Sequence, residues 1–282
     1  MTIPSLELAP GIAIGGPAFS TLPVIAGPCV IESAEMTLRA AELLAAIASR
    51  LRLPLIFKAS FDKANRSSGK SFRGPGLVEG LKVLAEVRRQ FSLPLLTDVH
   101  EPEQCDRAAE VVDVLQIPAF LCRQTDLLVA AAKTGRAINV KKGQFMAPDD
   151  MRRVIEKIRA AGNDRVTVTE RGVSFGYHNL VVDMRSFAWM QRDGIPVIYD
   201  VTHSLQLPGA GEEGTGGARE FAEPLARAAV AAGADGIFLE VHPEPDQALS
   251  DRDTQLPPDR AEALLASLLK VRAALSAVDG QV

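Results

Sequence analysis

Short apolar runs recur along the chain, and each is followed by a polar stretch and then by a segment with helical character. Eight runs show this arrangement, at residues 23–27, 55–59, 95–99, 112–117, 137–140, 166–169, 196–201 and 236–241. Continuous apolar runs of this length predict strands buried on both faces, as in a parallel sheet. After the first run, one face of a helix predicted over residues 34–50 carries Leu38, Ala41, Ala45, Ala48 and Leu51. The pattern therefore predicts eight strand–helix units.

Eight successive strand–helix units favour an α/β fold, the closed (β/α)8 TIM barrel. An open doubly wound sheet is the alternative fold. Further helices are predicted over residues 76–90 and 258–278. Near the N-terminus, apolar segments flank a turn at Pro10 and Gly11, which predicts a short β-hairpin within residues 1–16. No linker or break in composition divides the chain, so residues 1–282 are expected to form a single barrel domain.

Polar residues follow the predicted strands far more regularly than scattered surface charge would. In a (β/α)8 barrel the C-terminal ends of the strands carry the active site, so these residues are the candidates for chemistry. In chain order they are Cys29, Glu32, Ser33, Lys58, Lys63, Asn65, Arg66, Ser67, Asp98, His100, Glu101, Gln116, Arg123, Asn139, Lys141, Lys142, Glu170, Arg171, Asp200, His203, Glu240, His242 and Asp251.

The first group among these candidates is cationic. It consists of Lys58, Lys63, Lys141 and Arg171, with Arg66 and Arg123 further out. Lysine and arginine beside hydroxyl groups are suited to phosphate, and cations this dense repel one another unless anions fill the site. A merely solvated role is a weak explanation for Lys58 and Lys141, which directly extend apolar strands. Exposure to solvent is a stronger explanation for Lys142 and Arg73.

The second group offers ligands for a metal ion. Cys29, His203, Glu240 and Asp251 follow the first, seventh and eighth strands, and strand eight neighbours strand one in a closed barrel. A mixture of thiolate, imidazole and carboxylate suits Fe²⁺, Zn²⁺ or Mn²⁺ rather than Ca²⁺. The alternatives are a buried cysteine that only packs and a structural histidine. His242 competes with Glu240, because residues two apart in a strand share a face.

Composition and charge narrow the class of protein. The chain has 282 residues, is 47% hydrophobic and 23% charged, and carries a net charge of −4, which gives no indication of nucleic-acid or membrane binding. We find no apolar stretch of the length that spans a bilayer and no secretory signal. Three widely spaced cysteines indicate a reduced, cytoplasmic protein. Cys105 and Cys122 are expected to pack, and the glycine-rich part of segment 204–217 is either a lid or a merely flexible loop.

Several motifs at these positions resemble one known family, the 3-deoxy-D-manno-octulosonate 8-phosphate synthases. The resemblance extends from about residue 23 to 257. The motifs are AGPCVIES (26–33), FKASFDKANRSS (57–68), TDVHE (97–101), QIPAFLCRQTDL (116–127), NVKKGQ (139–144), RGVSFGYHNLVVDMRS (171–186), DVTHSLQLPG (200–209) and EVHPEPDQALSD (240–251). Such enzymes condense phosphoenolpyruvate with arabinose 5-phosphate and release inorganic phosphate. The resemblance also implies a homotetramer of barrels, each closed at its bottom by the N-terminal hairpin.

The resemblance assigns roles to residues of this chain. Phosphoenolpyruvate would be held by Lys58, Lys63, Gln116, Ala119 (through its backbone), Lys141 and Arg171. Arabinose 5-phosphate would meet Asn65, Arg66 and Ser67, with Arg123 from a neighbouring subunit. The residues expected to take part in catalysis are Lys58, Asn65, Asp98, His100, Lys141 and His203, and Asp200 is a further candidate for proton transfer.

Cys29 indicates the metal-dependent branch of that family, because the metal-free branch has asparagine at this position. His203, Glu240 and Asp251 would then complete the ligand set. One departure is that Arg252 and Asp253 follow Asp251 where the family often has smaller residues. Two alternative functions remain. One is the related 3-deoxy-D-arabino-heptulosonate 7-phosphate synthase, which uses erythrose 4-phosphate, and the other is a non-catalytic sugar-phosphate sensor.

Overall fold

Eight parallel strands form a closed barrel at the centre of the computed structural model, which describes residues 3–16, 22–65, 69, 71–210 and 216–279. The strands are hydrogen-bonded around the ring in the order β11-β14-β3-β4-β5-β6-β7-β8. They are β3 (Val24–Gly27), β4 (Leu55–Lys58), β5 (Leu95–Asp98), β6 (Val114–Ile117), β7 (Ala137–Lys141), β8 (Val166–Glu170), β11 (Val197–Asp200) and β14 (Gly236–Glu240). The predicted TIM barrel is confirmed, and closure of the ring excludes the open doubly wound sheet.

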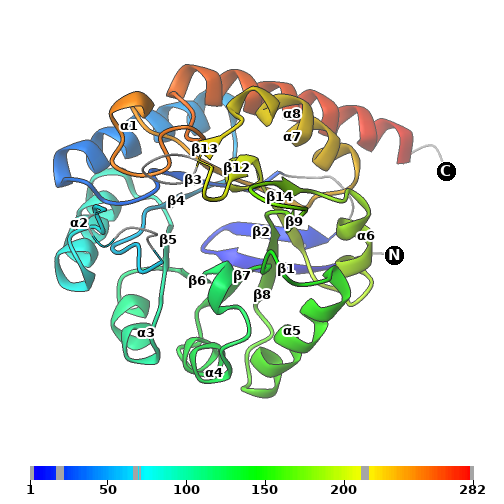
Figure 1. Ribbon diagram of the computed structural model, residues 1–282, viewed down its shortest axis with the longest axis horizontal. Coiled ribbons are helices and arrows are strands. Elements are labelled where there is room, and N and C mark those ends of the chain that lie inside the picture. Colours follow the sequence, from blue (N-terminus) through cyan, green and yellow to red (C-terminus); the bar gives the residue numbers. More distant parts are fainter. Residues whose placement is uncertain (1–2, 17–21, 66–68, 70, 211–215, 280–282) are drawn as a thin grey trace.

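A helix follows each barrel strand and covers the outside of the ring (Figure 1). The helices are α1 (Ala34–Leu51), α2 (Leu77–Phe91), α3 (Pro102–Ala109), α4 (Thr125–Lys133), α5 (Met151–Ala160), α6 (Arg185–Gln191), α7 (Ala222–Ala231) and α8 (Pro258–Asp279). The main hydrophobic core lies between these helices and the strands. The core includes the thiols of Cys105 and Cys122, which are free and buried, so their predicted packing role is confirmed.

Helix α1 shows how the sequence specifies this outer layer. The Ser33 hydroxyl caps the helix by accepting a hydrogen bond from the backbone N–H of Met36 at 3.1 Å. The fully buried positions are Thr37, Ala40, Ala41, Leu44 and Ile47. The predicted face was therefore wrong in part, because alanines on neighbouring faces widen the apolar stripe and hide its centre from a periodicity argument.

The N-terminal hairpin closes one end of the barrel. Strands β1 (Ile3–Ala9) and β2 (Ile12–Gly16) pair antiparallel around a turn in which Gly11 has a φ of +72°. Leu8 and Ile14 pack in one cluster with inward-facing residues of the barrel strands, among them Ile25 and Phe238. In Figure 1 the hairpin lies across the centre of the ring. Because this end is plugged, the barrel interior opens only at the C-terminal ends of the strands.

The loops at the open end carry additional short elements that the sequence did not predict. The strand pairs are β9 (Val173–Ser174) with β10 (Leu180–Val181) and β12 (Gln206–Leu207) with β13 (Gly216–Gly217), and the 3-10 turns are η1 (Ala119–Leu121), η2 (Pro148–Asp150), η3 (His203–Leu205), η4 (Arg219–Phe221) and η5 (Pro245–Gln247). The second pair joins the two ends of the predicted lid, whose residues 211–215 lie outside the described part of the chain. Among the described helices, we find none whose length and hydrophobicity would allow it to cross a membrane.

Candidate active site

A cavity of about 1030 Å³ occupies the open end of the barrel. Among the residues predicted to act there, those that line it are Lys58, Lys63, Asn65, Asp98, His100, Gln116, Ala119, Lys141, Arg171, His203 and Asp251. They come from loops or strand ends throughout the barrel. The fold thus brings the predicted phosphate-binding cations and two of the predicted metal ligands to one space, as expected for parallel strands that end at a common rim.

Lys58 is buried against the carboxylate of Glu240. Its Nζ lies 2.7 Å from Glu240 Oε1 and donates to the carbonyl oxygen of Cys29 at 2.9 Å. The side chains of Lys58 and Glu240 are buried, with exposures of 1% and 0%. Burial alone would raise the pKa of Glu240, but the charges of His203 and Lys58 outweigh it and hold that pKa well below its usual range. Glu240 is therefore a charged carboxylate deep in the site.

Lys141 forms a second buried cluster with Asp200 and His203. Lys141 Nζ is 2.8 Å from Asp200 Oδ2, and His203 Nδ1 is 2.9 Å from the same oxygen. Burial lowers the pKa of Lys141, which the charge of Asp200 only partly opposes. The amine also lies 4.0 Å from the centre of the Phe238 ring. The two central lysines are thus each paired with a carboxylate of the chain itself, so part of the positive charge of the cationic group is compensated within the protein.

Three side chains of the cavity each keep a buried polar atom that has no hydrogen-bond partner among the described residues. These atoms are Nη1 of Arg171, Oδ1 of Asp98 and Nδ1 of His100. Asp98 and His100 contact each other through Oδ2 and Nε2 at 3.2 Å. Burial lowers the pKa of His100, but its hydrogen bond to Asp98 outweighs burial and raises the pKa above the usual value. The site therefore offers both an open guanidinium for an anion and a histidine whose protonated form Asp98 stabilises.

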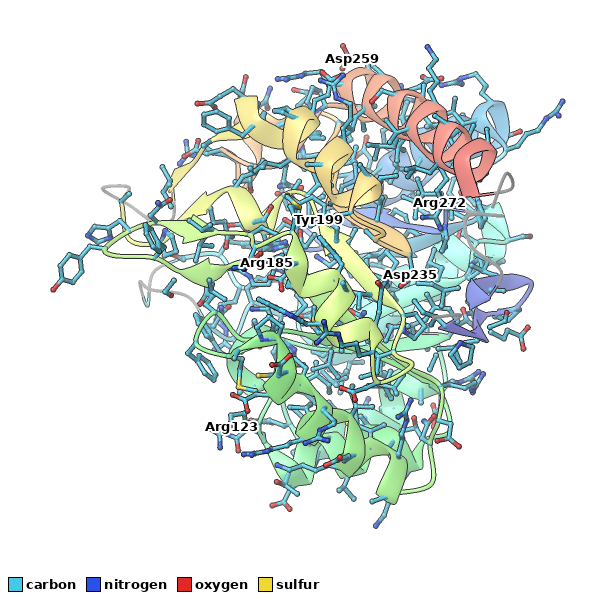
Figure 2. The ribbon with its side chains drawn as sticks, turned by 90° about the vertical axis from the view of Figure 1, so that its right-hand side faces the viewer. Arg123, Arg185, Tyr199, Asp235, Asp259 and Arg272 are labelled. Atoms are coloured by element: carbon cyan, nitrogen blue, oxygen red, sulfur yellow. The ribbon has the colours of Figure 1, made fainter. Side chains whose placement is uncertain are left out.

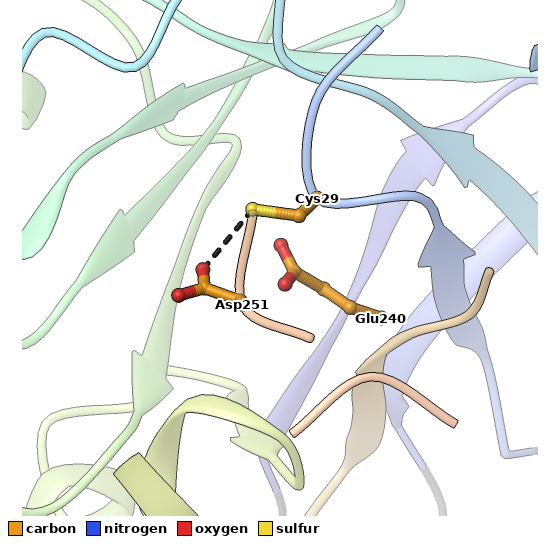
Figure 3. Close-up of side chains that lie close together, drawn as sticks. All are labelled: Cys29, Glu240 and Asp251. Atoms are coloured by element: carbon orange, nitrogen blue, oxygen red, sulfur yellow. Dashed lines mark hydrogen bonds between the residues drawn. The ribbon is translucent and has the colours of Figure 1, made fainter. Parts of the chain in front are cut away.

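Three of the four predicted metal ligands form a compact group at the wall of the cavity. Cys29, Glu240 and Asp251 each offer a ligand atom within 4.8 Å of the other two. The Cys29 thiol donates to Asp251 Oδ2 at 3.1 Å, and Figure 3 shows the three side chains converging from separate parts of the chain. His203 lies beside the group, with Nε2 at 3.5 Å from Glu240 Oε1 and 3.9 Å from Asp251 Oδ2. His203 therefore lies near two members of the group without itself belonging to the group of three.

The donor set fits a divalent transition-metal ion. Thiolate, imidazole and carboxylate ligands together suit Fe²⁺, Zn²⁺ or Mn²⁺. Burial and the neighbouring charges of Asp251 and Glu240 raise the pKa of the Cys29 thiol, so a cation is needed to stabilise the thiolate. In addition, Glu240 Oε2 is buried and has no hydrogen-bond partner among the described residues. These observations support a cation at this place without identifying it.

Residues that the sequence did not single out support this group. The Ser250 hydroxyl lies 2.8 Å from the Cys29 sulfur. The buried amide of Gln255 accepts from the Cys29 backbone N–H at 3.0 Å and donates to the Ser250 carbonyl at 2.8 Å. Asp251 itself adopts a φ of +47°, which non-glycine residues rarely do. Ser250 directly precedes Asp251, and this adjacency was the only sequence signal that could have identified it.

Other expectations for single residues differ from the structure. Lys142 does not face water: it directly follows β7, is fully buried and lies 3.5 Å from Glu170. His242 does not compete with Glu240, since its Nε2 is directed toward Glu32 at 3.6 Å. Arg73 is exposed, as expected, and pairs with Asp62.

The residues predicted to meet the sugar phosphate are only partly placed. Asn65 lines the cavity, whereas Arg66 and Ser67 lie outside the described residues. Arg123 is exposed and does not line the cavity of its own chain. Figure 2 shows Arg123 at the lower left of the molecule, away from Asp235 and Arg272 on the right. This position leaves it free to act elsewhere than in its own site.

Comparisons with known proteins agree with this arrangement. A family model described as the DAHP synthetase I family matches residues 7–277. Relatives named 2-dehydro-3-deoxyphosphooctonate aldolase include the protein of Pelobacter propionicus, 59% identical over 93% of this chain and 96% of the relative. Those of Trichlorobacter lovleyi and Geobacter metallireducens are both 60% identical, over 91% and 89% of this chain and 93% of each relative. The chain therefore belongs to the DAHP synthetase I family and, within it, to the group of 2-dehydro-3-deoxyphosphooctonate aldolases.

Proposed function

We propose that this protein is a transferase that condenses phosphoenolpyruvate with D-arabinose 5-phosphate and water. The products are 3-deoxy-D-manno-octulosonate 8-phosphate and inorganic phosphate. The observation that carries the proposal is the identity of about 60%, over about nine-tenths of the chain, to relatives whose printed name is a synonym of that synthase. The reaction provides the octulosonate sugar of lipopolysaccharide, and its substrates are cytoplasmic metabolites, so we propose the cytoplasm as its location.

The cations of the cavity have the chemistry to hold phosphoenolpyruvate. Arg171 offers a buried guanidinium with one open amino group, and Lys63 lies in the same cavity. Lys58 and Lys141 lie deeper, paired with carboxylates, so we propose that they meet the carboxylate end of the enol and the charge that develops during the reaction. Gln116, fixed by its bond to Asn139 at 2.8 Å, and the backbone of Ala119 would complete this site.

The bond changes in the proposed reaction are simple to state. Carbon 3 of the enol forms a bond to the aldehyde carbon, whose oxygen takes up a proton. The oxygen of water adds to carbon 2, and the bond between carbon 2 and the phosphate oxygen then breaks, with the bonding electrons leaving on phosphate. The hydroxyl on carbon 2 loses its proton and becomes the ketone, so the two protons of water end on the former aldehyde oxygen and on phosphate. Holding both substrates in one closed-ended cavity removes much of the entropic barrier. His100, whose protonated form Asp98 stabilises, is our candidate for the proton donor, and Asn65 lines the cavity where it can orient the sugar.

We propose that Cys29, His203, Glu240 and Asp251 hold one divalent ion, Fe²⁺, Zn²⁺ or Mn²⁺. When bound, such an ion supplies Lewis acidity that can orient an aldehyde oxygen or acidify water. Lys141 and Asp200 fix the His203 ring from the opposite side, through Nδ1, which leaves Nε2 directed at the ligand group. The chain's own residues thus preorganise the ligands.

We propose that the protein works as a homotetramer in which Arg123 serves a neighbouring site. Arg123 is exposed and does not line its own cavity, which fits a guanidinium that binds the sugar phosphate across an interface. Arg66 and Ser67 would bind the same phosphate from within the chain. The measurement of molar mass in solution, together with the effect of Arg123→Ala on arabinose 5-phosphate, tests this part.

Phosphate release tests the function directly. Purified, metal-reconstituted protein is incubated with phosphoenolpyruvate and either arabinose 5-phosphate, erythrose 4-phosphate or no aldose. We expect rapid release only with arabinose 5-phosphate. Preference for erythrose 4-phosphate would identify the related heptulosonate synthase instead, and binding of sugar phosphate without release in any mixture would identify a sensor.

A further inference from the structure

One polar side chain connects the anion-binding and the metal-binding parts of the cavity. Gln206 is the first residue of β12 and directly follows the η3 turn that carries His203. Its Oε1 accepts from Arg171 Nη2 at 2.5 Å, and its Nε2 donates to Asp251 Oδ1 at 3.3 Å. Gln206 also lines the cavity. It therefore lies between a guanidinium suited to a phosphate and a carboxylate suited to a cation.

The chemistry of the three groups fixes how this amide is oriented. A guanidinium only donates hydrogen bonds and a carboxylate only accepts them, so the carbonyl must face Arg171 and the amino group must face Asp251. The backbone N–H of Gln206 donates to the carbonyl of His203, and Gln206 pairs with Gly217 in the β12–β13 ribbon. The backbone position of Gln206 is thus set by the turn that presents His203.

Each of its two partners keeps a second polar atom that Gln206 does not contact. Arg171 is only 5% exposed, and its other amino group, Nη1, has no hydrogen-bond partner among the described residues. The other carboxylate oxygen of Asp251, Oδ2, faces the Cys29 thiol at 3.1 Å. Gln206 consequently binds one amino group of Arg171 and one oxygen of Asp251, which leaves Nη1 for an anion and Oδ2 for a cation.

We propose that Gln206 is a positioning residue that couples occupancy of the anion site at Arg171 to the affinity of the metal site at Asp251. Any shift of Arg171 toward an anion is passed to Asp251 through the amide, which changes how Oδ2 faces the cation. Such coupling is reciprocal: the anion changes the affinity for the cation by the same factor by which the cation changes the affinity for the anion. This inference rests on the proposed function, because it assumes an anion at Arg171 and a metal ion at Asp251.

The test measures the dissociation constant of Co²⁺ with and without inorganic phosphate. Metal-free protein is titrated with Co²⁺, and binding is followed by the cobalt–thiolate absorption that Cys29 would produce, a readout independent of turnover. The variant is Gln206→Met, which keeps the side-chain length but removes donor and acceptor. The control is Gln247→Met, the same substitution in the same cavity, where the amide binds Glu244 and no metal ligand.

We expect phosphate to change the Co²⁺ dissociation constant in the wild type and in Gln247→Met by the same factor. In Gln206→Met that factor should be smaller, by about fivefold, the lower end of typical coupling between sites. Direct attraction between a bound phosphate and the ion is the same in all three proteins, so the difference reports Gln206 alone. Equal factors in wild type and Gln206→Met, with both ligands bound, would overturn the inference and leave the proposed function intact. Failure of the wild type to bind Co²⁺ or phosphate would overturn both.

Discussion

Replacing Lys58 by methionine should destabilise the protein strongly, because it removes the partner of a buried carboxylate. Glu240 has an exposure of 0%, lies 2.7 Å from Lys58 Nζ, and its second oxygen has no hydrogen-bond partner among the described residues. The Nε2 atom of His203 lies further from the same carboxylate oxygen, at 3.5 Å. Breaking a buried ion pair on one side costs about 3–5 kcal/mol in the free energy of unfolding. Methionine has almost the same length as lysine, so little of the loss would come from an empty space.

The assay is thermal unfolding in the presence of a chelator, so that no divalent ion can compensate the charge of Glu240. At about 2 °C per kcal/mol for a chain of this size, Lys58→Met should lower Tm by about 6–10 °C. The double variant Lys58→Met/Glu240→Gln should recover at least about 1 kcal/mol of that loss, since residues in direct contact do not contribute additively. Added Mn²⁺ should raise the Tm of Lys58→Met by restoring a positive partner for Glu240.

Two results would refute this reasoning. The first is a decrease in Tm of less than about 2 °C for Lys58→Met without metal, which corresponds to about 1 kcal/mol and to the worth of an exposed ion pair. The second is a double variant whose loss equals the sum of the two single losses, because additivity means that the two side chains do not interact. Lys82→Met, in an exposed pair with Glu79, is the matched control and should leave Tm nearly unchanged.

Three further predictions address the ions, the interface and the titration of the site. Removing divalent ions with a chelator should abolish turnover, and adding Fe²⁺, Zn²⁺ or Mn²⁺ should restore it. The variant Cys29→Asn should keep some activity without metal. Full activity of the metal-stripped wild type would contradict the metal site. Arg123→Ala should raise KM for arabinose 5-phosphate about tenfold or more, because one charge-assisted contact of about 1.5–3 kcal/mol is lost. KM for phosphoenolpyruvate should stay unchanged. An equal rise in both constants would contradict a sugar-phosphate role. An NMR titration should place the pKa of His100 above 6.5, because the hydrogen bond to Asp98 outweighs the effect of burial. Protonation of His100 then stabilises the folded state fully below pH 6.5, and this contribution is lost as the pH rises through the pKa of the folded state. In Asp98→Asn that pKa should fall below 6.5, and an unchanged value would show that Asp98 is not its cause.

The barrel could be predicted because its strands are short, apolar and evenly interleaved with helices. The ends of the strands could also be predicted from the sequence, since a change from apolar to polar residues marks the rim wherever Lys58, Asp98 or Glu240 ends a strand. Closure of the ring then brings Cys29 and Glu240 together across most of the chain length. Pairing of β14 with β3 is the structural basis of that contact.

The partners of the predicted residues could not be predicted in the same way. Lys58 and Lys141 look alike in the sequence, yet each is neutralised by a different acid, because partner choice depends on side-chain directions around the ring. Lys142 was misjudged for the same reason: a one-residue step along a strand moves a side chain from the cavity to the helix-facing layer. Gln206 carries no charge, and the role proposed for it follows only from its hydrogen bonds to Arg171 and Asp251.

The measurement that tests the central claim most directly is the fate of isotopic oxygen during turnover. Phosphoenolpyruvate labelled with ¹⁸O in the oxygen that bridges carbon 2 and phosphorus is supplied with arabinose 5-phosphate, and the released phosphate is examined by ³¹P NMR. If water adds to carbon 2 and the carbon–oxygen bond breaks in this cavity, the phosphate carries the label and appears only when the sugar is present. Unlabelled phosphate, or release that does not require arabinose 5-phosphate, would contradict the account.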